Sequence, residues 1–265
     1  MRLSRRHALA GLAALASFRP GRARAVGDAG AFHPRVVTSG GAKLDVERSS
    51  APARWSYELV RRTSAPGRLA ASSVAFDQPA FAAEPFAIWA GASALAPLSG
   101  PERRGLERFL KMGGVLVVDD LAPAGGAFGA AARRELRRVL PDVAPVKLDS
   151  SHVVFKSYYI VDRPVGRVQG PPHVEALVRG RYAQVFLLSH DLLGALARSR
   201  AGGFALDVEP GGVAQREQAV RLAVNIAMYV LCSDYKDDQV HAPWLMRRRA
   251  RRRPCLWRVP GAQRR

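Results

Sequence analysis

Hydrophobic runs of strand length alternate along this chain with amphipathic stretches of helical length. Apolar runs at 35–40 and 86–91 predict buried strands, and the stretch 53–63, with its apolar residues on one face, predicts a helix. The clearest unit is "LSGPERRGLERFLKMGGVLVVDD" at 98–120, where Ser99 is placed to cap a helix and a glycine pair stops it before the next strand. A strand, a helix and a strand joined by short connections predict a parallel crossover.

The same alternation continues to residue 232. A helix is predicted at 130–141, two strands within 173–191, and a long helix packed on the sheet at 213–232. The chain has no internal repeat and no Ser- or Gly-rich linker, so these elements predict one α/β domain over 26–245. Its expected architecture is a mostly parallel sheet with helices on both faces.

The formal net charge of +19 belongs to the two ends of the chain. Six arginines lie in 1–25 and nine in 246–265, with no acidic residue in either segment. This leaves 26 basic and 22 acidic residues for 26–245, a net charge of only about +4, so the predicted domain has no nucleic-acid signal. The arginine-rich segment 246–265 is predicted to be a disordered tail that can attract an anionic membrane surface.

The N-terminal segment has the features of an export signal. Arg5 and Arg6 precede a short Ala-rich apolar run, and Ala23 and Ala25 have the spacing that a signal peptidase accepts. The paired arginines are similar to the twin-arginine motif, which carries folded proteins across the bacterial inner membrane. We therefore predict a cleaved signal peptide at 1–25 and a periplasmic or otherwise exported protein, with membrane association left open. Export also argues against nucleic acid as a partner.

Four stretches together resemble a bacterial family, domain-of-unknown-function family 4159. They are "FHPRVVTSGG" at 32–41, "GGVLVVDD" at 113–120, "SHVVFKSYYIVDRPVGRV" at 151–168 and "RLAVNIAMYVLCSDYKDDQVHAPWLMRRR" at 221–249. The resemblance covers almost the whole mature chain, and it implies the flavodoxin-like fold of class I glutamine amidotransferases. Some members are encoded near MoxR-type ATPases and von Willebrand A-type proteins, which implies a protein partner at the cell envelope.

Amidotransferase chemistry is not expected despite that fold. It needs a nucleophilic cysteine on a tight strand-to-helix turn, activated by a histidine and an acid. Cys232 lies at the end of a predicted helix, where a buried thiol is expected, and Cys255 lies in the arginine-rich tail. Neither G-x-C-x-G nor G-x-S-x-G occurs, and there is no cysteine spacing typical of zinc sites. We therefore expect no cofactor and no metal.

Asp119 and Asp120 end a predicted strand at the edge where doubly wound folds bind their ligands. Successive side chains of a strand point to opposite faces, so the two carboxylates are expected to diverge and not to form an acid–base dyad. One would face the crevice while the other caps the following turn. Asp120 also precedes a glycine-rich loop and is a candidate for binding a cation or a polar ligand, although no Walker lysine follows that loop.

Ser189, His190 and Asp191 have the residue types of a hydrolytic triad at the end of another predicted strand. Adjacent residues cannot adopt triad geometry among themselves, so capping of the short helix that follows, by Ser189 or Asp191, is the favoured interpretation. The catalytic alternative requires His190 to meet Asp119 or Asp120 at the same edge of the sheet.

Three further polar residues are singled out. His152 heads a motif shared with the family and is a candidate catalytic residue, with packing or turn formation as the alternative. Tyr158 is a candidate for ligand binding, although a strand that places Tyr158 and Tyr159 on opposite faces is the main interpretation. Asn225 is expected to be a buried hydrogen-bonding residue of the long helix. The acidic segment 234–241 is expected to be a solvated turn.

These observations lead to two functional hypotheses. The first is an exported, noncatalytic binding or assembly component at the bacterial cell envelope. Its candidate ligand-binding residues are Asp120, Ser189, Asp191 and Tyr158. The second is a hydrolase or metal-assisted enzyme that uses His190 or His152 with Asp119 or Asp120. Convergence of these side chains on one point would favour the enzyme, whereas scattered side chains with their own partners would favour binding.

Overall fold

The computed structural model describes residues 30–180 and 182–251, with only the course of the backbone for 233–251. One sheet has the strand order β2-β1-β3-β4-β7-β6-β5. Its strands are β1 (Arg35–Val37), β2 (Ser72–Val74), β3 (Phe86–Gly91), β4 (Val115–Asp120), β5 (Pro145–Leu148), β6 (Val174–Arg179) and β7 (Tyr182–Leu188). Neighbouring strands from β2 to β7 in this order pair in parallel. At the other edge, β6 pairs antiparallel with β7, and β5 pairs antiparallel with β6. This confirms the predicted, mostly parallel α/β sheet.

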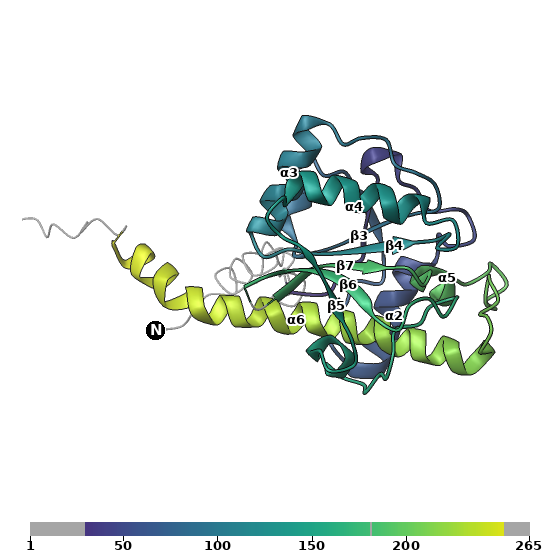
Figure 1. The fold of residues 1–265 in the computed structure, drawn as a ribbon. Helices are drawn as coiled ribbons and strands as arrows, with labels where there is room; N and C mark the ends of the chain where they lie inside the picture. The colour runs from purple at the N-terminus through teal and green to yellow at the C-terminus, as the bar shows by residue number, and fades with distance from the viewer. Residues whose placement is uncertain (1–29, 181, 252–265) are drawn as a thin grey trace, which may run out of the picture.

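Helices cover both faces of the sheet, as expected for a flavodoxin-like arrangement (Figure 1). They are α2 (Ala51–Thr63), α3 (Gly100–Lys111), α4 (Ala127–Val139), α5 (Leu192–Leu196) and α6 (Gly212–Arg251). Short 3-10 helices are η1 (Ser39–Gly41), η2 (Pro79–Ala83) and η3 (Val153–Lys156). Helices α3 and α4 lie on one face, and α2 and α6 lie on the other (Figure 1). The predicted β3-α3-β4 crossover is present, and β3 and β4 pair in parallel.

Strand β4 separates two hydrophobic cores. Val115 and Val117 belong to the core that contains Trp55 of α2, whereas Leu116 and Val118 belong to the core under α3 and α4. This alternation follows from the two-residue period of a strand, and both faces are apolar because both are covered by helices. The period also decides where the last two residues of β4 point.

Helix α3 begins with the cap that its sequence predicts. The Ser99 hydroxyl accepts a hydrogen bond from the Glu102 backbone N–H at 3.3 Å, and the Glu102 carboxylate accepts one from the Ser99 N–H at 2.8 Å. This reciprocal pair satisfies two N–H groups that the helix itself leaves free. At Gly105 the helix packs closely against the backbone of Phe76. A Cβ atom added at Gly105 would lie only 1.7 Å from the Phe76 carbonyl oxygen.

Three local predictions need correction. Tyr158 and Tyr159 lie in a bend after η3 and not in a strand, because the buried Asn225 side chain binds their backbone in place of a neighbouring strand. Helix α6 does not end near 232 but continues to Arg251, so the acidic segment 234–241 is helical and not a turn. Cys232 is exposed and unpaired, because it lies where α6 leaves the core. The buried, hydrogen-bonding role predicted for Asn225 is confirmed.

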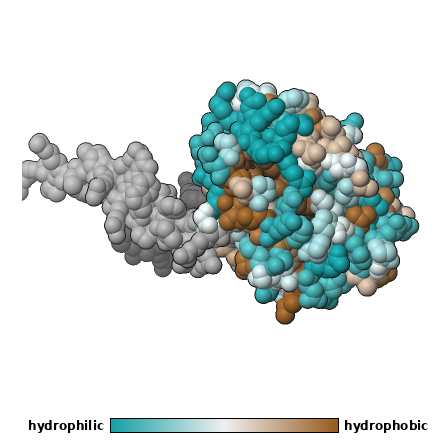
Figure 2. Space-filling view, in the orientation of Figure 1, coloured by the Kyte–Doolittle hydropathy of each residue, from teal (hydrophilic) through white to brown (hydrophobic). Residues whose placement is uncertain are grey.

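The surface mixes polar and apolar side chains. In Figure 2 hydrophilic residues cover most of the visible face of the domain, and hydrophobic residues form smaller groups between them. Within the described part of the chain, no helix combines the length and the apolar character that a bilayer crossing requires. The predicted signal peptide at 1–25 and residues 252–265 of the predicted tail lie outside the described residues.

The close approach at Gly105 leads to a prediction about stability. Gly105→Ala is expected to lower the free energy of unfolding by about 1–3 kcal/mol, as overpacking does in other cores. The added Cβ would meet the backbone of Phe76, which cannot move aside as a side chain can. Urea unfolding of the purified protein measures the loss.

Gly100→Ala, in the first turn of the same helix, is the matched control. Its added Cβ would meet only the end of the Arg104 side chain, at 3.3 Å, so little or no loss is expected. Equal losses for Gly100→Ala and Gly105→Ala would contradict the close-packing argument.

Candidate functional site

A cleft of about 690 Å³ lies at the carboxyl ends of β4 and β7. One wall is the loop 121–125 after β4, and another comes from the loop before β6, with Arg167, Val168, Gly170 and Pro171. Ser189, directly after β7, completes the lining. The carboxyl edge of a parallel sheet is where doubly wound folds bind ligands, and this volume is within the range of small-molecule sites. The cleft is therefore the candidate functional site.

Asp119 and Asp120 point to opposite faces of the sheet, as their positions in β4 predict. Asp119 is fully buried and accepts hydrogen bonds from the Leu192 and Leu193 N–H groups, at 3.0 and 2.8 Å. Asp120 accepts from the N–H groups of Ala122 and Gly129, both at 3.0 Å. The first carboxylate thus caps α5 and the second caps the following turn and α4. Neither one lines the cleft, and they do not form a dyad.

Asp191 is the centre of a buried ionic network. Its carboxylate accepts hydrogen bonds from Arg48, through Nε at 2.8 Å and a terminal nitrogen at 2.5 Å, and from Nε of Arg167. It also accepts from the Gly194 N–H at 3.0 Å, which makes Asp191 the N-cap of α5, as the favoured interpretation predicted. A second carboxylate, Asp45, binds Arg48 from the solvent side. The network joins three segments that are distant in sequence.

The charges of the network shift one another's proton affinities. Burial alone lowers the pKa of Arg48, but its hydrogen bonds to Asp191 and Asp45 outweigh that effect and raise the pKa above the usual value. Burial and the nearby Asp191 charge raise the pKa of Asp119 well above its usual value, against the two N–H groups that it accepts and the Arg48 charge. The surroundings of Asp119 therefore disfavour its charged form.

His190 lies behind the cleft wall and meets neither Asp119 nor Asp120. Its Nε2 is 2.8 Å from the Pro171 carbonyl oxygen, and its Nδ1 has no hydrogen-bond partner within the described residues. Burial is the main cause that lowers the pKa of His190 below its usual 6.5, so the ring is neutral at pH 7. The catalytic constellation that would join His190 to Asp119 or Asp120 is therefore not assembled.

His152 and Tyr158 lie outside the cleft. His152 is the N-cap of η3, where its Nδ1 accepts a hydrogen bond from the Val154 N–H at 3.2 Å. The Tyr158 hydroxyl donates to the Arg62 carbonyl oxygen at 2.7 Å. Both residues thus hold the segment around η3 in place. Of the candidate residues, only Ser189 lines the cleft, while Asp120, Asp191 and His190 lie beside it.

The sequence prediction missed the two arginines of the network. Arg48 stands in "LDVERSS", which has no motif, and Arg167 stands in the family motif "RPVGRV" but was not singled out. The signal that was available is their position, because Arg167 belongs to a distinctive motif and Arg48 precedes a predicted helix. Their common partner Asp191 is 143 residues from Arg48 in sequence, so no local pattern could reveal the pairing.

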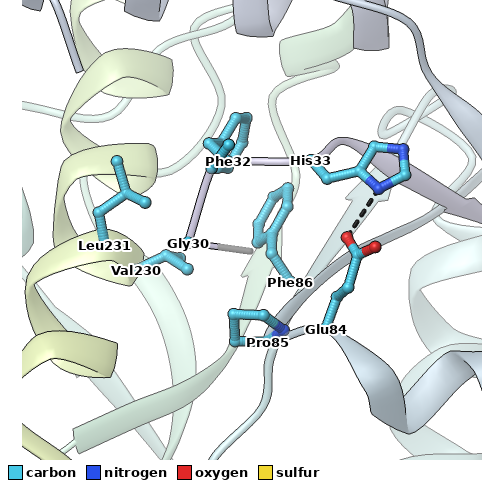
Figure 3. A pocket seen from close by; sticks show the side chains of 9 residues that line it. Gly30, Phe32, His33, Glu84, Pro85, Phe86, Val230 and Leu231 are labelled. Atoms are coloured by element: carbon cyan, nitrogen blue, oxygen red, sulfur yellow. Dashed lines mark hydrogen bonds and ion pairs between the residues drawn. The ribbon is translucent and has the colours of Figure 1, made fainter. Parts of the chain in front are cut away.

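A second cavity, at the opposite end of the sheet, is much smaller. Phe32 and Phe86 line it, together with Val230 and Leu231 of α6, and its volume of about 10 Å³ leaves room for roughly one water molecule. In Figure 3 the His33 ring turns away from this cavity toward Glu84, and its Nδ1 lies 2.7 Å from the carboxylate. This cavity is a packing gap and not a ligand site.

The described residues contain no group of three or more His, Cys, Asp or Glu side chains that is arranged to hold a metal ion. Asp120, the candidate cation ligand, has a backbone N–H group bound to each of its two oxygens. The acidic segment 234–241 lies where only the backbone is described.

The ionic network leads to a prediction about Asp191. Asp191→Asn is expected to lower the free energy of unfolding by about 3–5 kcal/mol, because it removes the buried counter-charge of Arg48 and leaves that guanidinium group with only the more exposed Asp45. Asparagine tolerates the left-handed backbone of this position, so the variant tests charge and not backbone strain. Asp45→Asn is the control, because that side chain is 40% exposed and a loss of about 1 kcal/mol or less is expected. Similar losses in the two variants, measured by urea unfolding, would contradict the central role of Asp191.

The lowered pKa of His190 leads to a prediction about pH. The unfolded chain takes up a proton on this ring near pH 6.5, before the folded protein does, so folding stability is expected to fall as the pH drops below about 6.5. The contribution of one such group has a slope of at most about 1.4 kcal/mol per pH unit. His190→Gln keeps an N–H donor for the Pro171 carbonyl group and does not titrate, so its stability is expected to change less between pH 7.5 and 5. An unchanged pH dependence in urea unfolding would contradict the assignment.

The chain was compared with known protein families and with curated proteins. The family model described as Domain of unknown function (DUF4159) matches residues 34–231, which is most of the chain and all of the strands described above. No curated protein matches. The matched range also includes Arg167, which lines the cleft, and Arg48, Asp119 and Asp191, which belong to the hydrogen-bonded network beside it. The chain therefore belongs to the DUF4159 family.

Proposed function

We propose that this protein is an exported, noncatalytic component of the bacterial cell envelope that binds a ligand or a partner group in the cleft at the carboxyl ends of β4 and β7. The observation that carries the proposal is that the acidic residues at this edge already have partners within the fold. The cleft is of ligand-binding size, yet the carboxylates of Asp119, Asp120 and Asp191 accept hydrogen bonds from backbone N–H groups, and Asp191 also pairs with arginines.

The alternative, a hydrolase or metal-assisted enzyme, has less support. A general base needs to lie within hydrogen-bond reach of a reacting group, with a second group to orient it. The His190 ring has a backbone carbonyl oxygen as its partner, and His152 caps a 3-10 helix away from the cleft. Side chains that are scattered and satisfied by the fold favour binding over catalysis.

The envelope location is supported by the sequence. The paired arginines, the short apolar run and the Ala-x-Ala spacing of 1–25 favour export, and the resemblance to proteins encoded near envelope components favours assembly. The arginine-rich segment 246–265 adds attraction to an anionic membrane surface.

Two measurements test this proposal. In cells that express the full chain, the protein is expected in the periplasmic or membrane fraction, and N-terminal sequencing is expected to start at or close to Val26. Purification from detergent-solubilised native membranes is expected to retain an envelope partner. Ala124→Phe, which adds bulk to the cleft wall, is expected to weaken that retention, whereas Arg61→Met, an exposed change on α2, is expected to leave it unchanged.

Cytoplasmic retention with residues 1–25 intact would overturn the export part. A stoichiometric metal on the purified protein that is lost in Asp119→Asn or His190→Gln, without any envelope partner, would overturn the noncatalytic part. Equal retention of the partner by Ala124→Phe and Arg61→Met would show that the cleft is not the binding site.

A further inference from the structure

Arg167 is the one charged side chain among the described residues that line the cleft. Its Nε donates to the buried Asp191, which also holds Arg48 and the first turn of α5. Its two terminal nitrogens have no acceptor within the described residues, and the side chain is 26% exposed. The guanidinium group is therefore fixed at one edge by the protein and leaves its terminal N–H groups available at the cleft.

This arrangement is suited to binding a carboxylate. A guanidinium group presents planar pairs of N–H donors that match the two oxygens of a carboxylate, and a side chain that is already held by Asp191 loses little further freedom on binding. No acidic side chain lines the cleft among the described residues, and the Asp191 carboxylate behind Arg167 is shared with Arg48 and the first turn of α5. Asp120, at the end of β4, is turned toward the N-terminus of α4.

The glycine-rich loop does not provide a phosphate cradle. Such cradles use free backbone N–H groups, but those of Gly125 and Gly126 donate to the Ala122 carbonyl oxygen, and that of Gly129 donates to Asp120. With a single arginine and no second cation in the described lining, the cleft matches a monoanion better than a phosphate dianion. The chemistry at the charged end is therefore that of a carboxylate.

The rest of the described lining is largely apolar. Leu121, Pro123, Val168 and Pro171 supply hydrophobic contact surface, and the half-buried Ser189 hydroxyl has no partner within the described residues. A ligand of matching chemistry has a carboxylate at one end, an apolar body, and at most a few additional polar groups.

We propose that the cleft binds a small organic acid, or an acyl group with a free carboxylate, through an ion pair between that carboxylate and Arg167. This inference rests on the proposed function, because it names the ligand class of the same cleft. Asp191 is then a positioning residue, which holds Arg167 in the orientation that receives the ligand.

The test uses three matched probes with the purified full chain: 3-phenylpropionate, the uncharged 3-phenylpropanol and 3-phenylpropyl phosphate. Isothermal titration calorimetry is expected to show saturable binding of the carboxylate, with affinity at least about tenfold above that of the alcohol, as expected for a charge-assisted hydrogen-bonded pair. The phosphate is expected to bind more weakly than the carboxylate.

Variants locate the binding. Arg167→Lys keeps the charge but not the paired N–H geometry and is expected to weaken carboxylate binding about tenfold, and Arg167→Met is expected to weaken it further. Arg61→Met removes an exposed positive charge elsewhere and is expected to have no effect. If urea unfolding shows that an Arg167 variant is not folded, Ala124→Phe replaces it, because this change adds bulk to the cleft wall and leaves the Arg167 side chain in the sequence.

Equal affinity for the acid and the alcohol, stronger binding of the phosphate, or equal affinity in Arg167→Lys and Arg61→Met would overturn the carboxylate assignment. If Ala124→Phe loses the envelope partner but the unsubstituted protein binds no carboxylate, this inference is overturned and the proposed function stands. If the unsubstituted protein binds the carboxylate but retains no envelope partner, the proposed envelope role is overturned and the carboxylate assignment stands.

Discussion

The ion pairs of Asp191 hold the carboxyl edge of this fold together. The carboxylate is completely buried, so its charge needs partners inside the protein, and Arg48, Arg167 and the N-terminus of α5 provide them. These partners come from the segment before α2, the loop before β6 and the helix after β7. One carboxylate therefore ties together the segments that border the cleft, and it also fixes the side chain that gives the cleft its charge.

The other acidic residues of this edge serve the helices that follow the strands. Asp119 and Asp120 end β4 on opposite faces, and each binds N–H groups that the first turn of a helix leaves free. The two aspartates at the end of β4 thus serve to cap helices on both faces of the sheet. Because their carboxylates are turned to these helices, the described lining of the cleft contains an arginine and no acid, which favours binding of an anion over acid–base chemistry.

The elements that depend on local pattern were predictable. The Ser99 cap, the β3-α3-β4 crossover and the alternation along β4 follow from propensities and periods that act over a few residues. Tyr158 and Tyr159 were misplaced because the Asn225 side chain, 66 residues from Tyr159, replaces strand pairing there. Helix α6 was predicted too short because the change to polar residues after 232 marks the end of its buried face and not the end of the helix.

For the site, the chain pattern was enough to bring Asp119, Asp120, Ser189 and His190 to one edge of a parallel sheet, because strand direction and period are local properties. Partner choice was decided only in the folded protein. Arg48 and Arg167 reach Asp191 across 143 and 24 residues, and His190 turns to the Pro171 carbonyl group and not to an aspartate. These pairings depend on which loop can supply a partner for each buried polar group. That is decided only when packing brings the loops together, so the sequence alone does not reveal it.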